Sequence, residues 1–508
     1  MNIKEIFQKV NIDYSFITDN FVKSVEFATL NSQLATENNI FFAIRGFKND
    51  GHRYISDAYR AGCRCFIVEG IEQIDGEVYH ESSIVIVRNI RLCFALCSTI
   101  MNDYPSAKIN MIGITGTKGK SSVTDLCYRI LSHNNNIMML STIKNIIGDE
   151  IYETDKTTLE ADKLQKYLRT GLDRGVDRAV VEVSSHAVTL HRIDGIDWNT
   201  GVFTTFSRDH LDLYGDMETY FDAKLEFFRI LSRSDKTGKK AVINIDDPKG
   251  PEVVSCLGES VRVIRVGRDD SFKTSIITDN DYLIHNPVSG FDGISFDLIN
   301  RETTLPIKSC MRGDFNINNI ALACVLALEE GVAVETVKKV ILNATGVEGR
   351  FEVVKQNPFI VIVDYAHSPD SITKILQEAA KISKNRVISI FGCTGDRDKE
   401  KRPIMGEISA DLADFTIITN DDTYTEPAES IAKQVEAGLT GRGLIKDRDY
   451  TVILDRSEAI LYGLKMAKEG DVIIVAGMGH QKKQILKNGA IDYNDKETIV
   501  RLLKSNNL

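Results

Sequence analysis

The stretch MIGITGTKGKSSVTDLCYRIL, residues 111–131, constrains the fold of this chain more than any other segment. Residues 111–115 are mostly apolar and β-branched, which predicts a buried strand. After the glycine-rich turn that follows, apolar residues recur at helical spacing, at Val123, Leu126, Cys127, Ile130 and Leu131. The segment therefore predicts a strand, a loop and a helix in that order.

The loop has the chemistry of a nucleoside triphosphate site. Glycines let backbone N–H groups surround phosphate oxygens, the start of the helix adds a positive dipole end, Lys120 can reach terminal phosphates, and the Ser121 hydroxyl can bind Mg²⁺. A strict phosphate-loop pattern needs glycine at Ile114, so a simple pattern search would reject the match. The alternative, a glycine-rich turn without a ligand, is disfavoured by the order of strand, Gly-Lys-Ser and helix. The predicted ATP contacts are Gly116, Thr117, Gly119, Lys120, Ser121 and Ser122.

Composition narrows the class of protein. A chain of 508 residues is too long to fold around one ordinary hydrophobic core, so its length suggests about three domains. A net charge of -10, without any Lys/Arg run, argues against a nucleic-acid partner. The nine cysteines are scattered along the chain and form no Cys-x-x-Cys pair. The sequence has neither the apolar segment of a signal peptide nor an apolar run long enough to span a membrane. We therefore expect a cytoplasmic protein that is not embedded in a membrane. A monomer is also expected, although no sequence feature indicates the oligomeric state.

The first hundred residues predict a small α/β module. Residues 39–46 and 65–70 have the pattern of strands, and residues 50–63 that of a loop and a helix. Asp50, Gly51 and His52 at the turn could contact a ligand, but Asp-Gly is also common turn chemistry, and taken alone the turn is the better interpretation.

Polar side chains end two predicted strands of the middle region. Glu182 ends a buried strand, and His210 follows the next one. The carboxyl ends of parallel strands are where ligands bind, so these two residues are candidate Mg²⁺ ligands. A single histidine is more often a hydrogen-bonded core residue, and a lone lysine such as Lys224 in an aromatic helix usually extends to solvent. The phosphate loop nearby favours the metal interpretation.

The last third of the chain predicts a Rossmann-like, doubly wound parallel sheet. Strand-like runs begin near Phe359, Arg386, Phe415, Tyr450 and Asp471, each separated by a helical segment. No GxGxxG motif is present, and polar clusters stand at the strand ends instead.

Taken together, the motifs resemble those of the Mur ligase family, most closely the MurE type that adds the third residue of the peptidoglycan stem peptide. The resemblance rests on the order and spacing of GTKGKSS, TTLEADKLQ, EVSSHAVTLHR, SRDHLDLYG, DAKLEFF, NIDDP, GDFNINN, GVEGRFE, VDYAHSPDS, GDRDKEKRPIMG and GMGHQKKQ. It implies an α/β protein of three domains: a UDP-muramoyl-binding module (1–107), a phosphate-loop ATPase domain (108–346) and a Rossmann-like amino-acid-binding domain (347–508).

The resemblance also implies roles for individual residues. Lys120, His210 and Lys224 are implied as catalytic, and the implied metal site is formed by Ser121, Glu182, His210 and Lys224. Lys224 matches a lysine that is carbamylated in the family, and two Mg²⁺ ions are expected. Adenosine-side contacts are implied for Asn316, Arg350 and Asp364. The UDP-sugar and dipeptide contacts would be Ser32, Asp50, Gly51, His52, Thr157, Thr158, Ser184 and Arg192. The amino-acid contacts would be Arg397, Asp421, Asp422, Tyr424, Gly477 and Gln481.

The implied reaction is ATP-dependent formation of an amide bond. ATP would phosphorylate the D-Glu carboxylate of UDP-MurNAc-L-Ala-D-Glu, and the amine of an amino acid would displace phosphate from the acyl phosphate. Such chemistry depends on positioning and charge neutralisation more than on a covalent group of the protein.

Departures from the family pattern bear on the amino acid. The Asp-Asn-Pro-Arg motif of diaminopimelate-adding enzymes has Tyr424 in place of its arginine, and Gln481 replaces a glutamate that would meet a distal ammonium. Losing a charge-assisted contact costs about 1.5 to 3 kcal/mol, enough to alter preference. These changes favour L-lysine or a similar diamino acid, with meso-diaminopimelate as the alternative.

Other departures keep two further alternatives open. Asn31 and Gln33 flank Ser32 where Asp and Arg are usual, Thr205 stands where Asn is expected, and Lys118 replaces a common Asn of the phosphate loop. A related ligase acting on another carboxylate acceptor, such as a folylpolyglutamate synthetase, is one alternative. A nucleotide-binding protein without catalysis is the other, which the retained lysines and metal positions disfavour.

Overall fold

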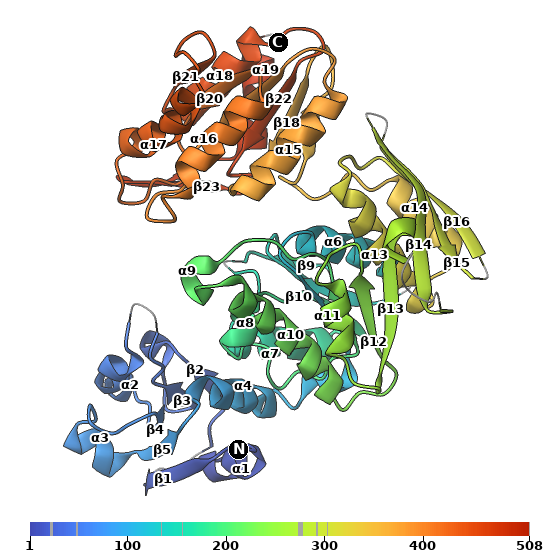
Figure 1. The fold of residues 1–508 in the computed structure, drawn as a ribbon. Coiled ribbons are helices and arrows are strands. Elements are labelled where there is room, and N and C mark those ends of the chain that lie inside the picture. The colour runs from blue at the N-terminus through green and yellow to red at the C-terminus, as the bar shows by residue number, and fades with distance from the viewer. Residues whose placement is uncertain are drawn as a thin grey trace. The chain divides into compact units, whose positions relative to one another are not determined.

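The computed structural model describes residues 1–20, 24–46, 49–133, 135–154, 156–272, 278–290, 293–301 and 303–506, without the side chain of residue 212. The chain forms two compact units (Figure 1). The first comprises Met1–Phe206, Tyr214–Tyr282 and Leu322–Ala333. The second comprises Ser207–Leu213, Leu283–Ala321 and Val334–Leu508. Each is described by itself.

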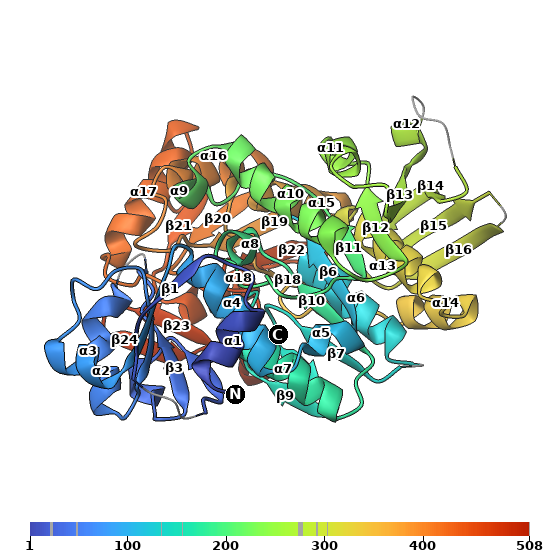
Figure 2. The same cartoon turned by 90° about the horizontal axis from the view of Figure 1, so that it is seen from below.

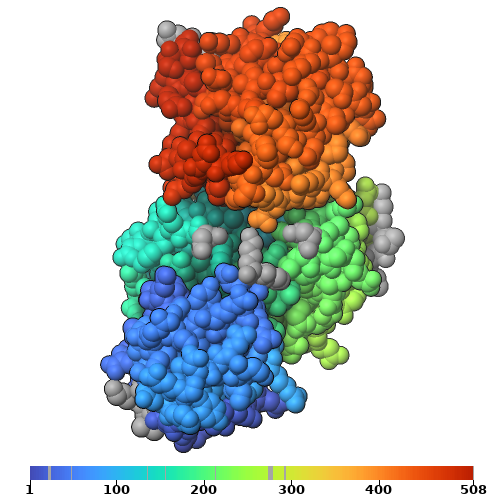
Figure 3. Space-filling view, turned by 90° about the vertical axis from the view of Figure 1, so that its left-hand side faces the viewer, coloured from blue at the N-terminus to red at the C-terminus, as the bar shows by residue number. Residues whose placement is uncertain are grey.

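The N-terminal part of the first unit is a sheet with the strand order β1-β5-β4-β3-β2, in which β1 alone is antiparallel to its neighbour. Its residues form a compact body in the space-filling view, coloured blue (Figure 3). Apolar side chains of α1 and α4 pack in one cluster, and those of α2 and α3 pack in another. The elements are α1 (Ile3–Lys9), β1 (Tyr14–Asp19), β2 (Phe27–Thr29), η1 (Ser32–Leu34), β3 (Asn39–Phe42), η2 (Gly51–Tyr54), α2 (Ile55–Arg60), β4 (Cys65–Val68), α3 (Gly76–Glu81), β5 (Ser83–Val87), α4 (Ile90–Met101) and α5 (Pro105–Lys108).

The rest of the first unit surrounds a parallel sheet with the order β13-β12-β11-β6-β10-β7, extended by antiparallel β8 and β9. Helices cover both faces of this sheet, so side chains on both sides of each strand are buried. The strands are therefore nearly continuous runs of apolar residues. The elements are β6 (Asn110–Thr115), α6 (Lys120–Leu131), β7 (Ile137–Leu140), β8 (Asn145–Ile147), β9 (Glu150–Tyr152), α7 (Ala161–Asp173), β10 (Arg178–Glu182), α8 (Ser185–Thr189), β11 (Thr200–Phe203), α10 (Met217–Arg233), β12 (Lys239–Asn244), α11 (Gly250–Ser255), β13 (Val261–Arg268) and α12 (Asp269–Phe272).

Three long antiparallel strands, β14 (Asp281–Gly290), β15 (Gly293–Asn300) and β16 (Thr303–Ser309), lie side by side (Figure 2). Burial alternates along β15, with Ile294, Phe296 and Leu298 inside, as expected for strands with one covered face. Helix α14 (Val334–Leu342) contacts β16. The chain also forms helices α9 (Leu211–Tyr214) and α13 (Phe315–Glu329).

The C-terminal part is a doubly wound sheet with the order β17-β18-β22-β19-β20-β21, parallel except for β17. Helices α15, α16 and α17 pack on one face, and α18 and α19 pack on the other (Figure 1). The predicted α/β class and Rossmann-like sheet are confirmed. The elements are β17 (Glu352–Lys355), β18 (Ile360–Asp364), α15 (Pro369–Ile382), β19 (Val387–Phe391), α16 (Lys401–Leu412), β20 (Phe415–Ile418), α17 (Ala428–Gly441), β21 (Tyr450–Val452), α18 (Arg456–Met466), β22 (Val472–Ala476), β23 (Lys483–Leu486), β24 (Gly489–Asp492) and α19 (Asp495–Asn506).

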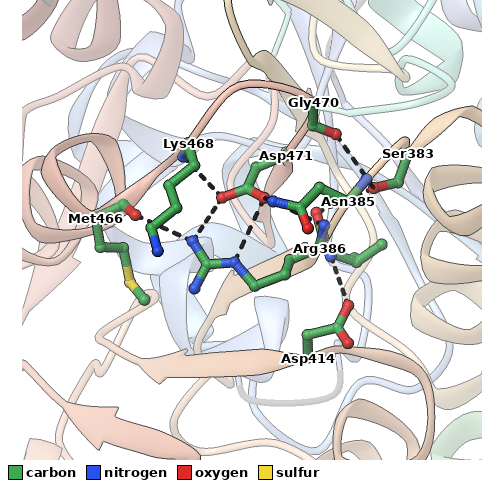
Figure 4. A network of polar contacts seen from close by, with 9 residues as sticks. Ser383, Asn385, Arg386, Asp414, Met466, Lys468, Gly470 and Asp471 are labelled. Atoms are coloured by element: carbon green, nitrogen blue, oxygen red, sulfur yellow. Dashed lines mark hydrogen bonds and ion pairs between the residues drawn. The ribbon is translucent and has the colours of Figure 1, made fainter.

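A polar network joins the amino ends of β19 and β22 (Figure 4). The buried Asp471 carboxylate accepts hydrogen bonds from Arg386 Nη2 at 2.6 Å, Asn385 Nδ2 at 2.8 Å and the Lys468 N–H at 2.8 Å. This edge is opposite to the carboxyl ends of the strands, where ligands bind in such sheets. The network therefore has a structural role.

Within the described part of the chain, no helix is both long and apolar enough to cross a membrane.

Candidate active site

The phosphate loop lies between the end of β6 and the start of α6, as the sequence predicts. Gly116 has a φ of +147°, and a Cβ there would lie 1.9 Å from Thr204 Oγ1, so only glycine fits. Gly119, with a φ of +86°, is the N-cap of α6. Because glycine has no side chain to cap the helix, the first N–H groups of α6 are available to an anion such as phosphate.

Two lysines converge on one carbonyl of this loop. Lys120 Nζ donates to the carbonyl oxygens of Gly116 and Thr117, both at 3.0 Å, and Lys224 Nζ donates to Gly116 O at 2.8 Å. Lys224 is 1% exposed and lies 4.6 Å from the centre of the Tyr220 ring. The alternative in which this lysine extends to solvent does not apply, because the loop carbonyl gives its ammonium a buried acceptor.

Glu182, at the end of β10, is fully buried beside the phosphate loop. Its carboxylate accepts from the Thr142 N–H at 3.1 Å and from Thr142 Oγ1 at 3.0 Å. Burial raises the pKa of Glu182, and the Lys120 ammonium, Thr142 and the Ser121 hydroxyl oppose that rise. The carboxylate is therefore held next to the two loop residues that were predicted to bind phosphate and Mg²⁺.

The residues around Glu182 fit one Mg²⁺ ion. A buried carboxylate and a neighbouring hydroxyl are hard oxygen donors, and Mg²⁺ in nucleotide sites takes one or two protein ligands plus phosphate oxygens and water. No cluster of three or more His, Cys, Asp or Glu able to hold a metal occurs in the described part of the chain. His210, with a φ of +54° and a side chain 42% exposed, belongs to the second unit. Its pairing with Glu182 stays a prediction.

The residues expected to face the dipeptide form a connected group. Thr158 Oγ1 donates to the Glu182 carbonyl at 2.8 Å and to Ser184 Oγ at 3.3 Å. Arg192 donates to the Thr158 carbonyl at 3.2 Å and pairs with Glu160 at 2.8 Å. Thr157, next to Thr158, is half-buried. This group adjoins the predicted metal site through the backbone carbonyl of Glu182.

In the N-terminal module, Asp50 and His52 hold the loop that they occupy. Asp50 Oδ1 contacts the His52 N–H at 3.0 Å and His52 Nδ1 at 2.8 Å, and the Glu69 N–H donates to His52 Nε2 at 3.4 Å. The hydrogen bonds from the His52 N–H and the His52 ring lower the pKa of Asp50. A Cβ on Gly51 would lie 2.7 Å from Ile44 backbone atoms. The turn interpretation therefore describes this structure, while Ser32 begins η1 and is half-buried.

The expected adenosine-side residues all lie in the second unit. Asn316 is 4% exposed and bonds to the Arg312 carbonyl at 2.7 Å. Asp364, at the end of β18, accepts from the Phe351 N–H at 2.7 Å. The Arg350 guanidinium lies 4.7 Å from the centre of the Tyr365 ring. Asp364 and Arg350 are thus joined through the turn that precedes β17.

The expected amino-acid site contains a buried, incompletely bonded carboxylate. Asp421 follows β20, is 2% exposed, and accepts from the Asp422 N–H at 2.6 Å. Its Oδ2 has no hydrogen-bond partner among the described residues. Gly477, with a φ of +117°, leaves room for this oxygen, because a Cβ there would lie 2.5 Å from it. Burial raises the pKa of Asp421 to about 6, against the opposing effect of Arg456.

The other residues of the expected amino-acid site provide hydrogen-bond acceptors and one guanidinium group. Asp422 accepts from the Ile485 N–H at 2.7 Å, which ties the β23 strand to this loop. Burial raises the pKa of Tyr424, and a hydrogen bond from the exposed Arg397 opposes that rise. Gln481 Oε1 is buried without a partner in the described structure. The site can therefore bind a cation, and Arg397 can bind a carboxylate beside Tyr424.

Sequence reasoning missed the residues that support these groups. Thr142, which holds Glu182, follows β7, so it is a polar residue at the end of a parallel strand, the signal that identified Glu182 itself. Tyr220 Oη lies 3.1 Å from Thr117 Oγ1. Thr204 bonds to the phosphate loop from the end of β11, and so does Thr205, which the sequence marked only as a departure from the family pattern.

Comparisons with known proteins agree with this geometry. The Mur ligase middle domain matches residues 114–327, and the Mur ligase, glutamate ligase domain matches residues 349–479. The chain is 36% identical to the UDP-N-acetylmuramoyl-L-alanyl-D-glutamate--2,6-diaminopimelate ligase of Clostridium botulinum, over 99% of this chain and 100% of that protein. The chain belongs to the Mur ligase family.

Other Mur ligases resemble it over most of its length. The ligase of the same name from Clostridioides difficile is 36% identical over 92% of each chain. A solved structure of a ligase of this name has a TM-score of 0.67 at 25% identity, covering 100% of this chain and 99% of the other. The MurF ligase of Thermotoga maritima in complex with ADP shares the fold, with a TM-score of 0.59 at 17% identity over 95% and 97% of the two chains. The predicted family and its ligase class are confirmed.

Proposed function

We propose that this Mur ligase joins a diamino acid to UDP-MurNAc-L-Ala-D-Glu with hydrolysis of ATP to ADP and phosphate. The observation that carries the proposal is full-length similarity to the Clostridium botulinum ligase together with a phosphate loop whose Lys120, Ser121 and neighbouring Glu182 stand at one site. The peptidoglycan precursor is the substrate in the names of that relative and of the Clostridioides difficile ligase.

The residues present can perform the phosphoryl transfer and the amide formation. Lys120 and the start of α6 neutralise the charge that develops on the transferred phosphoryl group. Arg192, Thr158 and Ser184 hold the acceptor peptide so that its D-Glu carboxylate attacks the terminal phosphate of ATP. The amine of the incoming amino acid then attacks the acyl phosphate, and phosphate leaves. Ser121 and Glu182 would hold Mg²⁺, which would supply further charge neutralisation at the phosphates.

Two amino acids fit the second unit for different reasons. The relatives named above add 2,6-diaminopimelate, and Arg397 beside Tyr424 offers a guanidinium for its distal carboxylate. L-lysine is favoured by the loss of the arginine at position 424. In both cases we expect the distal ammonium to contact Asp421 Oδ2 or Gln481 Oε1, two buried acceptors that have no hydrogen-bond partner among the described residues.

A phosphate-release assay with UDP-MurNAc-L-Ala-D-Glu tests the function and separates the two amino acids. We expect ATP-dependent release with either meso-diaminopimelate or L-lysine, at a kcat/KM at least about tenfold above that for the other, and a product of the corresponding mass. L-Ornithine and L-alanine serve as controls for length and for the distal ammonium. Binding of ATP without turnover for any amino acid would point to a different carboxylate acceptor and overturn the proposal.

We further propose that Lys224 carries a carbamate, formed by addition of CO₂ to its amine. Its position supports this, because Lys224 is buried and shares the Gly116 carbonyl with Lys120, whose positive charge would stabilise an anion there. The carbamate would add an oxygen donor for a second Mg²⁺ at this site.

Activity after acid treatment tests the carbamate. We expect wild-type protein returned to neutral pH to regain activity several-fold faster with bicarbonate than in CO₂-free buffer. Lys224→Arg keeps the cation but forms no carbamate, so it should show low activity that bicarbonate does not change. Equal recovery of the wild type in both buffers would contradict the carbamate.

A further inference from the structure

Two threonines at the end of β11 form hydrogen bonds to three residues of the phosphate-loop segment and lie close to a fourth, Gly116. Thr204 Oγ1 donates to the Lys118 carbonyl at 2.6 Å and to the Thr115 carbonyl at 3.2 Å. The Thr205 carbonyl accepts from the Thr117 N–H at 2.6 Å. The Gly116 carbon lies so close to Thr204 Oγ1 that no side chain fits between them.

Thr205 bonds both backbone polar groups of one loop residue with a single hydroxyl. Its Oγ1 accepts from the Lys118 N–H and donates to the Lys118 carbonyl, both at 3.2 Å. Together with the bond to Thr117, it therefore occupies two consecutive N–H groups of the loop. Phosphate must then be bound by the N–H groups from Gly119 onward and by Lys120.

The two threonines are themselves anchored to the sheet. The Thr204 N–H donates to the Thr115 carbonyl at 3.0 Å, which continues the pairing of β11 with β6. Asn244, at the end of β12 and 2% exposed, donates to the Thr204 carbonyl at 2.7 Å. The loop thus has a fixed connection to three parallel strands.

We propose that Thr205, supported by Thr204 and Asn244, is a positioning residue that sets the shape of the phosphate loop for nucleotide binding. The resemblance to Mur ligases leads one to expect asparagine at position 205. Its amide could also accept from the Lys118 N–H and donate to the Lys118 carbonyl, because it carries both an acceptor and a donor. Thr205 performs this task with one hydroxyl. The inference rests on the proposed ATP site and adds a role for a residue outside it.

Binding of ADP and ATP to variants at position 205 tests the proposal. Thr205→Val keeps the shape and removes two hydrogen bonds, so we expect affinity for both nucleotides and the KM for ATP to worsen about tenfold. The KM for UDP-MurNAc-L-Ala-D-Glu should change less than about twofold, a selectivity that general loosening of the fold would not give. Thr205→Ser and Thr205→Asn should stay within about threefold of the wild type. Thr170→Val, on an exposed part of α7, is the matched control.

Each outcome is decisive. Wild-type nucleotide affinity in Thr205→Val would overturn the positioning role while leaving the proposed function intact. Equal losses for both substrates, or failure of Thr205→Asn to retain affinity in a protein that melts like the wild type, would also overturn it. If the wild type binds neither ADP nor ATP, the ATP site itself is wrong and the proposed function fails with it.

Discussion

Replacing Lys120 with alanine is expected to lower the rate of ATP-dependent phosphate release by about 10³-fold or more, as loss of a charged donor at a phosphoryl-transfer site does. Lys120 donates to two carbonyls of its own loop and lies next to Glu182. It is therefore a cation of the loop that is predicted to bind the terminal phosphates. Initial rates of phosphate release at saturating ATP measure the effect.

The control for this variant is Lys166→Ala, which removes an exposed lysine from α7 in the same unit. We expect Lys166→Ala to retain the wild-type rate and both variants to unfold at nearly the wild-type temperature. A Lys120→Ala enzyme that turns over at the wild-type rate would show that the loop does not bind the reacting phosphates.

Replacing Glu182 with glutamine is expected to lower the rate by about 10²-fold and to raise the Mg²⁺ concentration needed for half-maximal rate by at least about tenfold. Glutamine keeps an oxygen that can accept from Thr142 but loses the negative charge that Mg²⁺ needs. A Mg²⁺ titration of the phosphate-release rate measures both effects.

The melting temperature of Glu182→Gln shows whether its lower rate comes from loss of the carboxylate or from misfolding. Burial raises the pKa of Glu182, so the ionised form is disfavoured in the folded protein, and stability from this group is present at low pH and lost as pH rises through the folded pKa. Neutral glutamine removes that cost, so Glu182→Gln should melt at the wild-type temperature or above it at neutral pH. Glu252→Gln, an exposed residue of α11, is the control and should change neither rate nor Mg²⁺ dependence. Unchanged Mg²⁺ dependence in Glu182→Gln would contradict the metal assignment.

Local sequence determined the elements that carry the site. The β6 strand, the phosphate loop and α6 are consecutive, so hydrophobic period, glycines and Gly-Lys-Ser in one short segment were enough to predict them. Glu182 was found in the same way, because the end of a buried parallel strand is a recognisable place. Apolar runs separated by helical segments likewise predicted the Rossmann-like sheet of the C-terminal part.

Only the tertiary structure decided which distant residues complete the site. Lys224 and Gly116 are 108 positions apart, and nothing in the pattern around Lys224 indicates that its ammonium is buried against that carbonyl. The contacts of Thr205 with Lys118, and of Gly477 with Asp421, also join residues that are far apart in the sequence. Local sequence patterns indicate which face of a helix or strand is apolar. The hydrogen-bond partner of a buried polar group depends instead on how distant strands and loops pack together in the folded protein.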